Sequence, residues 1–361
     1  MIAKTKQRFA FEPDYAVPPG QTLQETIDHL GVDQKELAAR TGMAAKTINQ
    51  IIKGKAPLTP DTALRFERVT GLSARTWNNL EANYREQLSR MESSKHLASQ
   101  CEWLKCIPTK ELVARGAIEA SEDSVAMIER TLRFFGVASV DAWHEGWSKP
   151  QFSFRTSPTA DGHDGSLASW LRLAELKSQS IECKPFDHKR FSAAVRSIRE
   201  LTLAEPSIFV EQVVKRCREA GVSVALVPEI KGASISGAAT WLTTSKAMIA
   251  LNLRGKSNDK FWFTFFHEAG HILNDSKKEL FIDVDYIDDP REHSANEFAR
   301  NILIPPQHDL ELSGLKSFAA VRAFAKKIHI APGIVVGRLQ REKIIPYSHL
   351  NSLKVRLQWK S

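Results

Sequence analysis

The residues of this sequence best suited to chemistry are two histidines that flank a glutamate. His267 and His271 lie four positions apart in the run His-Glu-Ala-Gly-His. On a helix, that spacing places both rings on one face, where they can bind a single zinc ion. A catalytic zinc ion usually takes three protein ligands and keeps a fourth position for water. A third ligand must therefore come from elsewhere, and Glu292 and Glu297 are the candidates.

Glu268, which follows the first histidine, is the predicted general base. Zinc would lower the pKa of its bound water towards neutrality, and Glu268 would remove a proton as that water attacks a peptide carbonyl. The same carboxyl group would then return the proton to the leaving amine. The group that would stabilise the oxyanion stays unassigned, with Tyr286 and His293 as the two candidates for that role.

Two other interpretations compete with a catalytic zinc site. A match of this length also arises by chance on surface helices, but here the apolar run 261–266 precedes it and predicts a buried helix. A buried glutamate flanked by histidines needs a partner such as a metal. The second alternative stays open: the site holds a metal, a toxin or a small ligand without turnover.

A small sheet and several helices must position these residues. From about residue 191 the pattern indicates two amphipathic helices, then short apolar strands, then the histidine-bearing helix. The expected helices cover 191–201 and 209–220, the strands 222–227, 238–242 and 247–251, and the last helix 261–273. This order indicates an α+β unit in which the sheet leads into the metal-binding helix.

Residues 237–305 resemble the ImmA/IrrE family of zinc metallopeptidases. Three stretches carry the resemblance: Ile-Ala-Leu-Asn at 249–252, Phe-Thr-Phe-Phe-His-Glu-Ala-Gly-His-Ile-Leu at 263–273, and Glu-x-x-Ala-Asn-x-Phe-Ala-x-x-Ile-Leu-Ile-Pro at 292–305. The resemblance implies a zincin-like metallopeptidase fold. In its Glu-x-x-Ala-Asn pattern the first residue is the ligand, which selects Glu292 over Glu297. Asn296, one turn later, would orient a ligand histidine.

The N-terminal region predicts a second function. Residues 23–30 have the period of a helix that stops at Gly31, and Asp33 with Glu36 forms a capping box for a second helix. After a tight turn, a third helix is expected at 44–52. Two short helices joined by such a turn are the helix-turn-helix unit, whose second helix enters the major groove of DNA.

Residues 18–90 resemble the HigA-type antidote proteins of the lambda-repressor-like XRE family. The resemblance rests on Gln-x-x-Leu-Ala at 34–38, Gly42, Ile-Asn-x-Ile-Ile-x-Gly-Lys at 48–55, Leu-Thr-Pro at 58–60 and Trp-x-x-Leu at 77–80. It implies a homodimer on palindromic operator DNA and neutralisation of a RelE/HigB-like toxin. It also implies that Gln34 contacts a phosphate and that Ala45, Lys46 and Gln50 face bases.

The predicted DNA-contacting residues begin the second helix and follow the third. They are Gln34, Ala45, Lys46, Thr47, Asn49, Gln50, Lys53 and Lys55. Small and amide side chains suit base edges, because Gln pairs with adenine and Lys with guanine. The net charge is +8, and residues 40–60 hold four basic residues and no acidic one. The alternative is a helical dimerisation module with a solvated basic face.

Composition places the chain among cytoplasmic proteins. It has no apolar N-terminal stretch of a secretory signal, and its longest apolar runs are far shorter than the ~20 residues needed to cross a bilayer. Four irregularly spaced cysteines do not indicate a disulfide framework. We therefore expect a cytoplasmic location, reduced thiols and no membrane partner.

The expected fold class is mainly α with a small α+β domain. The expected divisions are a five-helix helix-turn-helix domain at 1–90, a helical connector at 91–190, the metallopeptidase domain at 191–312 and a C-terminal helical segment at 313–361. A loop is expected at 157–165, where Gly, Pro, Asp and Ser are concentrated. The predicted function is a DNA-binding regulator or antitoxin with a zinc-dependent endopeptidase domain that acts on a protein or peptide substrate.

Overall fold

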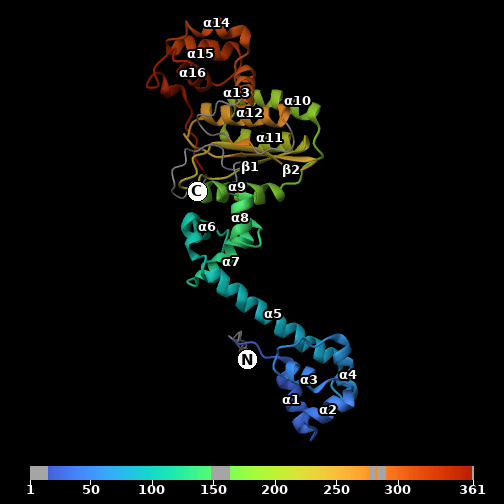
Figure 1. The fold of residues 1–361 in the computed structure, drawn as a ribbon. Coiled ribbons are helices and arrows are strands. Elements are labelled where there is room, and N and C mark those ends of the chain that lie inside the picture. The colour runs from blue at the N-terminus through green and yellow to red at the C-terminus, as the bar shows by residue number, and fades with distance from the viewer. Residues whose placement is uncertain (1–14, 148–162, 276–280, 283–289, 360–361) are drawn as a thin grey trace, which may run out of the picture. The chain divides into compact units, whose positions relative to one another are not determined.

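The computed structural model describes residues 15–147, 163–275, 281–282 and 290–359. The chain forms two compact units, Met1–Gln100 and Cys101–Ser361, and each is considered by itself. Most described residues are helical, with one small sheet in the second unit (Figure 1). The predicted fold class, mainly α with a small α+β part, is therefore confirmed. The four-part domain division stays a prediction.

In the part of the first unit that the structure describes, five helices surround one core. They are α1 (Pro19–His29), α2 (Gln34–Thr41), α3 (Ala45–Ile52), α4 (Pro60–Thr70) and α5 (Ala74–Ala98). Leu23, Ile48 and Trp77 are fully buried, and the Phe66 ring meets Trp77 edge to face at 5.6 Å between centroids. The helical period of the sequence thus supplies the apolar faces that make this core.

Helix α5 is the longest helix among the described residues. It spans 25 residues, and its sequence contains neither Gly nor Pro. Arg85 pairs with Glu81 and Arg90 with Glu86, both at i,i+4 spacing that supports an exposed helix.

Helix α2 begins with half of the predicted capping box. The Asp33 carboxylate accepts a hydrogen bond from the Glu36 backbone N–H at 2.7 Å. The Glu36 side chain, however, pairs with Arg40 one turn ahead. Because the Glu36 carboxylate pairs with Arg40, the N-terminal cap of α2 is provided by the Asp33 side chain.

The second unit begins with short helices packed through aromatic rings. They are η1 (Cys101–Cys106), α6 (Thr109–Ala114), α7 (Ser124–Phe135), α8 (Val140–Trp147) and α9 (His163–Gln179). Trp143 is buried and meets both Trp103 and Phe135 edge to face, with centroids 5.5 and 5.7 Å apart. These tryptophans are therefore core residues, as expected of large apolar side chains.

The loop predicted at 157–165 is wrong at its end. Residues 157–162 lie outside the described residues, but residues 163–165 already belong to α9. A Cβ on Gly165 would lie 1.9 Å from the Cys106 carbonyl oxygen. The glycine therefore allows close packing against η1, which composition alone cannot separate from a turn.

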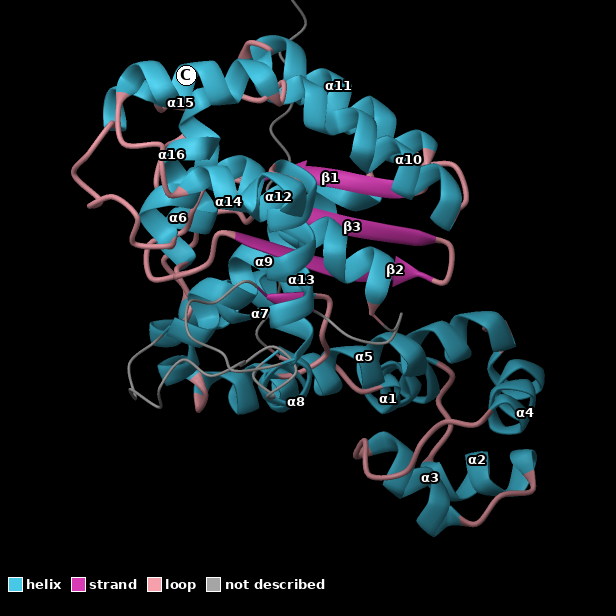
Figure 2. Ribbon diagram, turned by 90° about the horizontal axis from the view of Figure 1, so that it is seen from above, coloured by secondary structure: helices cyan, strands magenta, loops and turns pink. Residues whose placement is uncertain are grey.

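A four-stranded sheet lies at the centre of the second unit. Its strands are β1 (Val222–Leu226), β2 (Gly237–Thr243), β3 (Lys246–Leu251) and β4 (Phe281–Ile282), in the order β1-β3-β2-β4 (Figure 2). β1 is parallel to β3, whereas β2 is antiparallel to both β3 and β4. The three predicted strands are all present, and β4 was not predicted.

Helices cover both faces of this sheet. Helix α9 packs against one face, and α10 (His188–Ile198), α11 (Pro206–Glu219) and α12 (Asn258–Asn274) lie on the other (Figure 1). The 3-10 helix η2 (Arg199–Leu203) follows α10, and α13 (Pro290–Leu303) packs against α12. This arrangement buries α12 between the sheet and other helices.

The C-terminal segment completes the same core. It contains η3 (Pro306–His308), α14 (Asp309–Leu312), α15 (Phe318–Lys327), α16 (Pro332–Arg341) and η4 (Asn351–Leu353). Asn258 at the start of α12 exchanges two hydrogen bonds with Val355, and Asp259 forms an ion pair with Lys354 at 2.7 Å. The end of the described chain therefore holds the first turn of α12 in place.

Among the described residues, every helix is too short or too polar to span a bilayer.

Replacing Asp33 with Ala should lower the free energy of unfolding of the helix-turn-helix unit by ~1 kcal/mol, because the N-cap hydrogen bond to Glu36 is lost. Denaturant unfolding followed by circular dichroism would measure this. The matched control is Glu36→Ala, which removes an exposed ion pair of ~0.5 kcal/mol or less and keeps the cap. Equal losses in the two variants would contradict the assignment of the cap to Asp33.

Candidate metal centre

Helix α12 presents His267 and His271 on one face, as their spacing predicts. Both side chains are at most 1% exposed, and their Nε2 atoms lie 3.1 Å apart. The preceding apolar residues explain the burial, because Phe265 and Phe266 are fully enclosed in the core. The helix is therefore anchored by its aromatic side chains while its two imidazoles face each other.

Helix α13 brings the third side chain to the histidines. Glu292 lies in its first turn, with Oε2 3.1 Å from His267 Nε2 and Oε1 3.3 Å from His271 Nε2. The two helices approach closely where Gly270 faces α13, since a Cβ there would lie 3.3 Å from the Ala295 Cα. Two small residues at the crossing let the carboxylate reach both rings.

These three side chains fit a zinc ion. Their ligand atoms all lie within 4.8 Å of one another. Zn–N and Zn–O bonds of about 2.0–2.1 Å in a tetrahedron place ligand atoms about 3.3 Å apart, near the separations of 3.1 and 3.3 Å here. Two imidazoles and one carboxylate also leave a fourth position, as in catalytic zinc sites.

The carboxylate of Glu292 is held in its charged form. Burial raises the pKa of Glu292, but the hydrogen bonds from His267 and His271 outweigh this effect and lower the pKa to about 2. A carboxylate must be deprotonated to bind a metal. Glu292 is therefore ready to act as a ligand at neutral pH.

Asp275 is a site residue that the sequence analysis missed. Its Oδ2 lies 2.6 Å from His271 Nδ1 and accepts a hydrogen bond from that nitrogen. The bond favours the tautomer with the proton on Nδ1, in which the Nε2 lone pair can bind a metal, and it orients the ring. A signal was available, because Asp275 lies four residues after His271, one helical turn along the same face.

The other predicted site residues lie in different surroundings. Glu268 is fully buried on α12 beside the two histidines, whereas Glu297 and His293 are exposed on α13. Asn296 is half-buried one turn after Glu292. Tyr286 lies outside the described residues. The structure thus brings Glu292, and not Glu297, to the histidines, and it is Asp275 that holds His271.

In the first unit, helix α3 presents most of the predicted DNA-contacting residues to solvent. Ile48 and Ile51 are buried, so the opposite face is open. The exposed members of the predicted set are Ala45, Lys46, Gln50, Lys53 and Lys55. A solvent-facing row of basic and amide side chains is what major-groove recognition requires.

Three predicted contacts are only partly accessible. Thr47 is half-buried, and Asn49 donates to the Gln34 side-chain oxygen at 3.3 Å. Gln34 in turn donates to the Gln24 side chain at 2.9 Å. This chain of amide side chains ties α1, α2 and α3 together, so Gln34 and Asn49 help to hold α3 in place.

Two families match parts of the chain. Residues 23–77 match the family described as Helix-turn-helix, and residues 219–312 match a peptidase family described as IrrE N-terminal-like domain. The second match contains His267, His271 and Glu292 on α12 and α13, the three side chains that could hold a metal ion.

Curated relatives resemble the N-terminal part. The uncharacterised HTH-type transcriptional regulator YddM of Escherichia coli (strain K12) is 38% identical over 63 residues, which are 18% of this chain and 67% of that protein. Virulence-associated protein I of Dichelobacter nodosus is 33% identical over 70 residues, 19% of this chain and 65% of that protein. The chain thus spans about two thirds of the length of each relative.

Solved structures of antidote proteins are also similar. One, of the HigA family from Coxiella burnetii, is 26% identical with a TM-score of 0.22, over 23% of this chain and 92% of that chain. The Pseudomonas aeruginosa antitoxin HigA with the higBA promoter is 25% identical with a TM-score of 0.22, over 23% of this chain and 90% of that chain. TM-scores this low do not establish a shared overall fold.

The family matches agree with both resemblances found in the sequence, which are therefore confirmed at the level of family. The chain belongs to the XRE-type helix-turn-helix family through its N-terminal unit and carries an IrrE N-terminal-like peptidase domain in its C-terminal unit.

Proposed function

We propose that this chain is a transcriptional regulator of the toxin-antitoxin type whose C-terminal unit is a zinc-dependent endopeptidase. The observation that carries the enzymatic part is the cluster of His267, His271 and Glu292, whose ligand atoms have the separations of a tetrahedral zinc site. The match to a peptidase family over the same residues supports it. The substrate class is a protein or peptide.

In this proposal the three side chains hold the zinc ion, which supplies Lewis-acid chemistry that polarises a carbonyl group and makes a water molecule more acidic. Glu268 takes the proton of the attacking water on its carboxylate and passes it to the leaving amine. Asp275 keeps the His271 ring oriented through its 2.6 Å hydrogen bond. The enclosed position of Glu268 strengthens its electrostatic interactions with neighbouring groups.

The second candidate is an antitoxin-repressor whose C-terminal unit binds a metal, toxin or small ligand without turnover. The burial of the site favours it, since Glu268 is 0% exposed and both histidines are at most 1% exposed. A peptide carbonyl must reach these groups in a peptidase, whereas a purely metal-binding site has no such need. Substitution of Glu268 separates the two candidates.

The N-terminal unit is proposed to bind operator DNA. The exposed row on α3 and the family match at 23–77 support this role. Lys46 and Gln50 are proposed to contact base edges, while Lys53 and Lys55 are exposed just after the end of α3 and suit phosphates. By its resemblance to HigA-type proteins, the regulator is proposed to act as a homodimer and to neutralise a RelE/HigB-like toxin.

The zinc site can be tested through the residue that orients it. Asp275→Asn should lower zinc affinity roughly 10- to 100-fold, because loss of an outer hydrogen-bond partner weakens a histidine ligand. Competition with a chromogenic chelator measures the affinity, and metal analysis should find one zinc per chain in the parent and none after His271→Ala. Glu297→Gln is the control and should bind zinc like the parent. Parent-like affinity in Asp275→Asn would count against this role.

Turnover has its own test. Glu268→Gln removes the carboxylate but keeps the side-chain volume, so it should bind zinc normally and lose peptidase activity by at least about 100-fold. Comparing the cellular protein profiles of cells that express the parent or this variant would reveal the substrate. Identical profiles would end the enzyme proposal and leave the non-catalytic antitoxin-repressor.

Operator recognition is tested on α3. Lys46→Ala with Gln50→Ala should abolish preference for the operator, because base contacts confer specificity. Much of the salt-dependent, non-specific affinity should survive, since phosphate contacts supply it. Gel-shift titrations against operator and scrambled DNA measure both quantities. Arg75→Ala, an exposed change on α5, is the control; unchanged operator preference in the double variant would refute the assigned recognition helix.

A further inference from the structure

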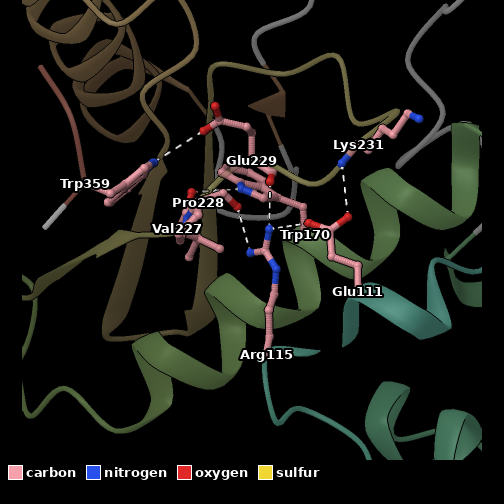
Figure 3. Close-up of polar contacts among 8 residues, drawn as sticks. All are labelled: Glu111, Arg115, Trp170, Val227, Pro228, Glu229, Lys231 and Trp359. Atoms are coloured by element: carbon pink, nitrogen blue, oxygen red, sulfur yellow. Dashed lines mark hydrogen bonds and ion pairs between the residues drawn. The ribbon is translucent and has the colours of Figure 1, made fainter. Parts of the chain in front are cut away.

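Side chains from α6 and α9 hold the backbone that follows β1. Trp170 Nε1 donates to the Val227 carbonyl at 3.2 Å (Figure 3). Arg115 donates from one guanidinium nitrogen to the Pro228 carbonyl at 2.9 Å and from another to the Glu229 carbonyl at 2.7 Å. Consecutive carbonyls are thus bound by one planar fork, a geometry that only arginine offers.

The guanidinium group is itself fixed in place. Glu111, one turn earlier on α6, pairs with Arg115 at 2.5 Å and accepts a hydrogen bond from the Lys231 backbone N–H at 3.3 Å (Figure 3). Both charged side chains are less than a third exposed. Trp359 adds a hydrogen bond to the Glu229 carboxylate at 3.4 Å. Hydrogen bonds from α6, from α9 and from the C-terminal end of the described chain therefore hold the segment 227–231 in place.

The far end of the same loop is tied to β3. Asn252, buried at the end of β3, donates its side-chain amide to the Ile235 carbonyl at 2.7 Å and its backbone N–H to the Ser236 carbonyl at 3.1 Å. Between the two anchors, Ile230 and Ala233 are buried. A loop with both ends bonded and its apolar residues packed transmits a shift at one end to the other.

This loop ends against the predicted general base. Gly237, the first residue of β2, lies so close to α12 that a Cβ there would be 2.7 Å from Glu268 Oε1 and 2.4 Å from the Thr264 methyl carbon. The backbone of Gly237 thus forms one wall of the space that the Glu268 carboxylate occupies. Gly237 pairs with Leu251 of β3, and the loop 227–236 leads directly into it.

We infer that Arg115 is a positioning residue for Glu268, acting through the loop 227–236 and the wall formed by Gly237. The inference rests on the proposed peptidase function for its chemical meaning. It places a determinant of the catalytic geometry on α6, the first α-helix after the helix-turn-helix unit. Arg115 touches neither the histidines nor a substrate, so its effect is on the placement of the base.

Two measurements on the full chain test this inference in Arg115→Ala. Hydrogen–deuterium exchange should become at least tenfold faster in peptides spanning 227–237. The visible absorption spectrum of the Co²⁺-loaded protein should shift in the same direction as in Gly237→Ala, because both changes displace the carboxylate next to His267. Co²⁺ affinity should stay within about threefold of the parent, since the ligands are unchanged. The control is Arg130→Ala, whose guanidinium donates to the carbonyls of Glu119 and Ala120 and pairs with the Glu119 carboxylate, away from the loop 227–236.

Three results would overturn the inference. One is parent-like exchange in Arg115→Ala, and another is faster exchange confined to 227–231. The third is a Co²⁺ spectrum that Arg115→Ala leaves unchanged while Gly237→Ala alters it. If Arg115→Ala does not fold, Arg115→Lys keeps the charge but loses the fork and should show the same changes at smaller size. A parent that binds no Co²⁺ would refute the proposed metal function, whereas exchange would still decide whether Arg115 holds the loop.

Discussion

Burying a carboxylate beside two imidazoles is the constraint on which the C-terminal unit depends. An isolated charge in the interior is costly, so buried ionisable groups require partners of opposite charge, hydrogen bonds or a metal. His267, His271 and Glu292 meet this requirement together, and Asp275 extends the set outward to the end of α12. The surrounding fold supplies a helix that is buried along most of its length and a second helix close enough to contribute the carboxylate.

Most of the unit can be understood from how α12 is held. Its aromatic residues pack against the sheet, and its first turn is tied to the C-terminal segment through Asn258 and Asp259. Gly270 gives α13 room to approach. Because α12 is held at its start, along its apolar face and at the crossing with α13, its histidines have little freedom to separate. A preorganised ligand set of this kind is what metal binding requires.

The N-terminal unit follows a different rule. Its core is closed by apolar residues of five helices, and its chemically useful side chains lie outside that core. The amide chain from Gln24 through Gln34 to Asn49 is an exception, because it joins three helices beneath the exposed row. Binding groups on the surface of a rigid support suit recognition of an external polymer, while the enclosed C-terminal cluster suits a small cation.

The sequence by itself determined the local structure and the chemistry of the motifs, because helical period, caps and ligand spacing are properties of neighbouring residues. It was enough to place α3 and α12, to pair His267 with His271 and to find the three main strands. It failed where the same local composition has two causes. Gly165 was expected in a loop, but it lies in α9, where the lack of a side chain allows close packing against η1. Asp275 could have been found by its spacing. The family resemblance favoured Glu292 over Glu297 as the third ligand, but only the tertiary structure shows that Glu292 lies beside the two histidines. That placement depends on how closely two helices cross, which is set by contacts between residues far apart in the chain.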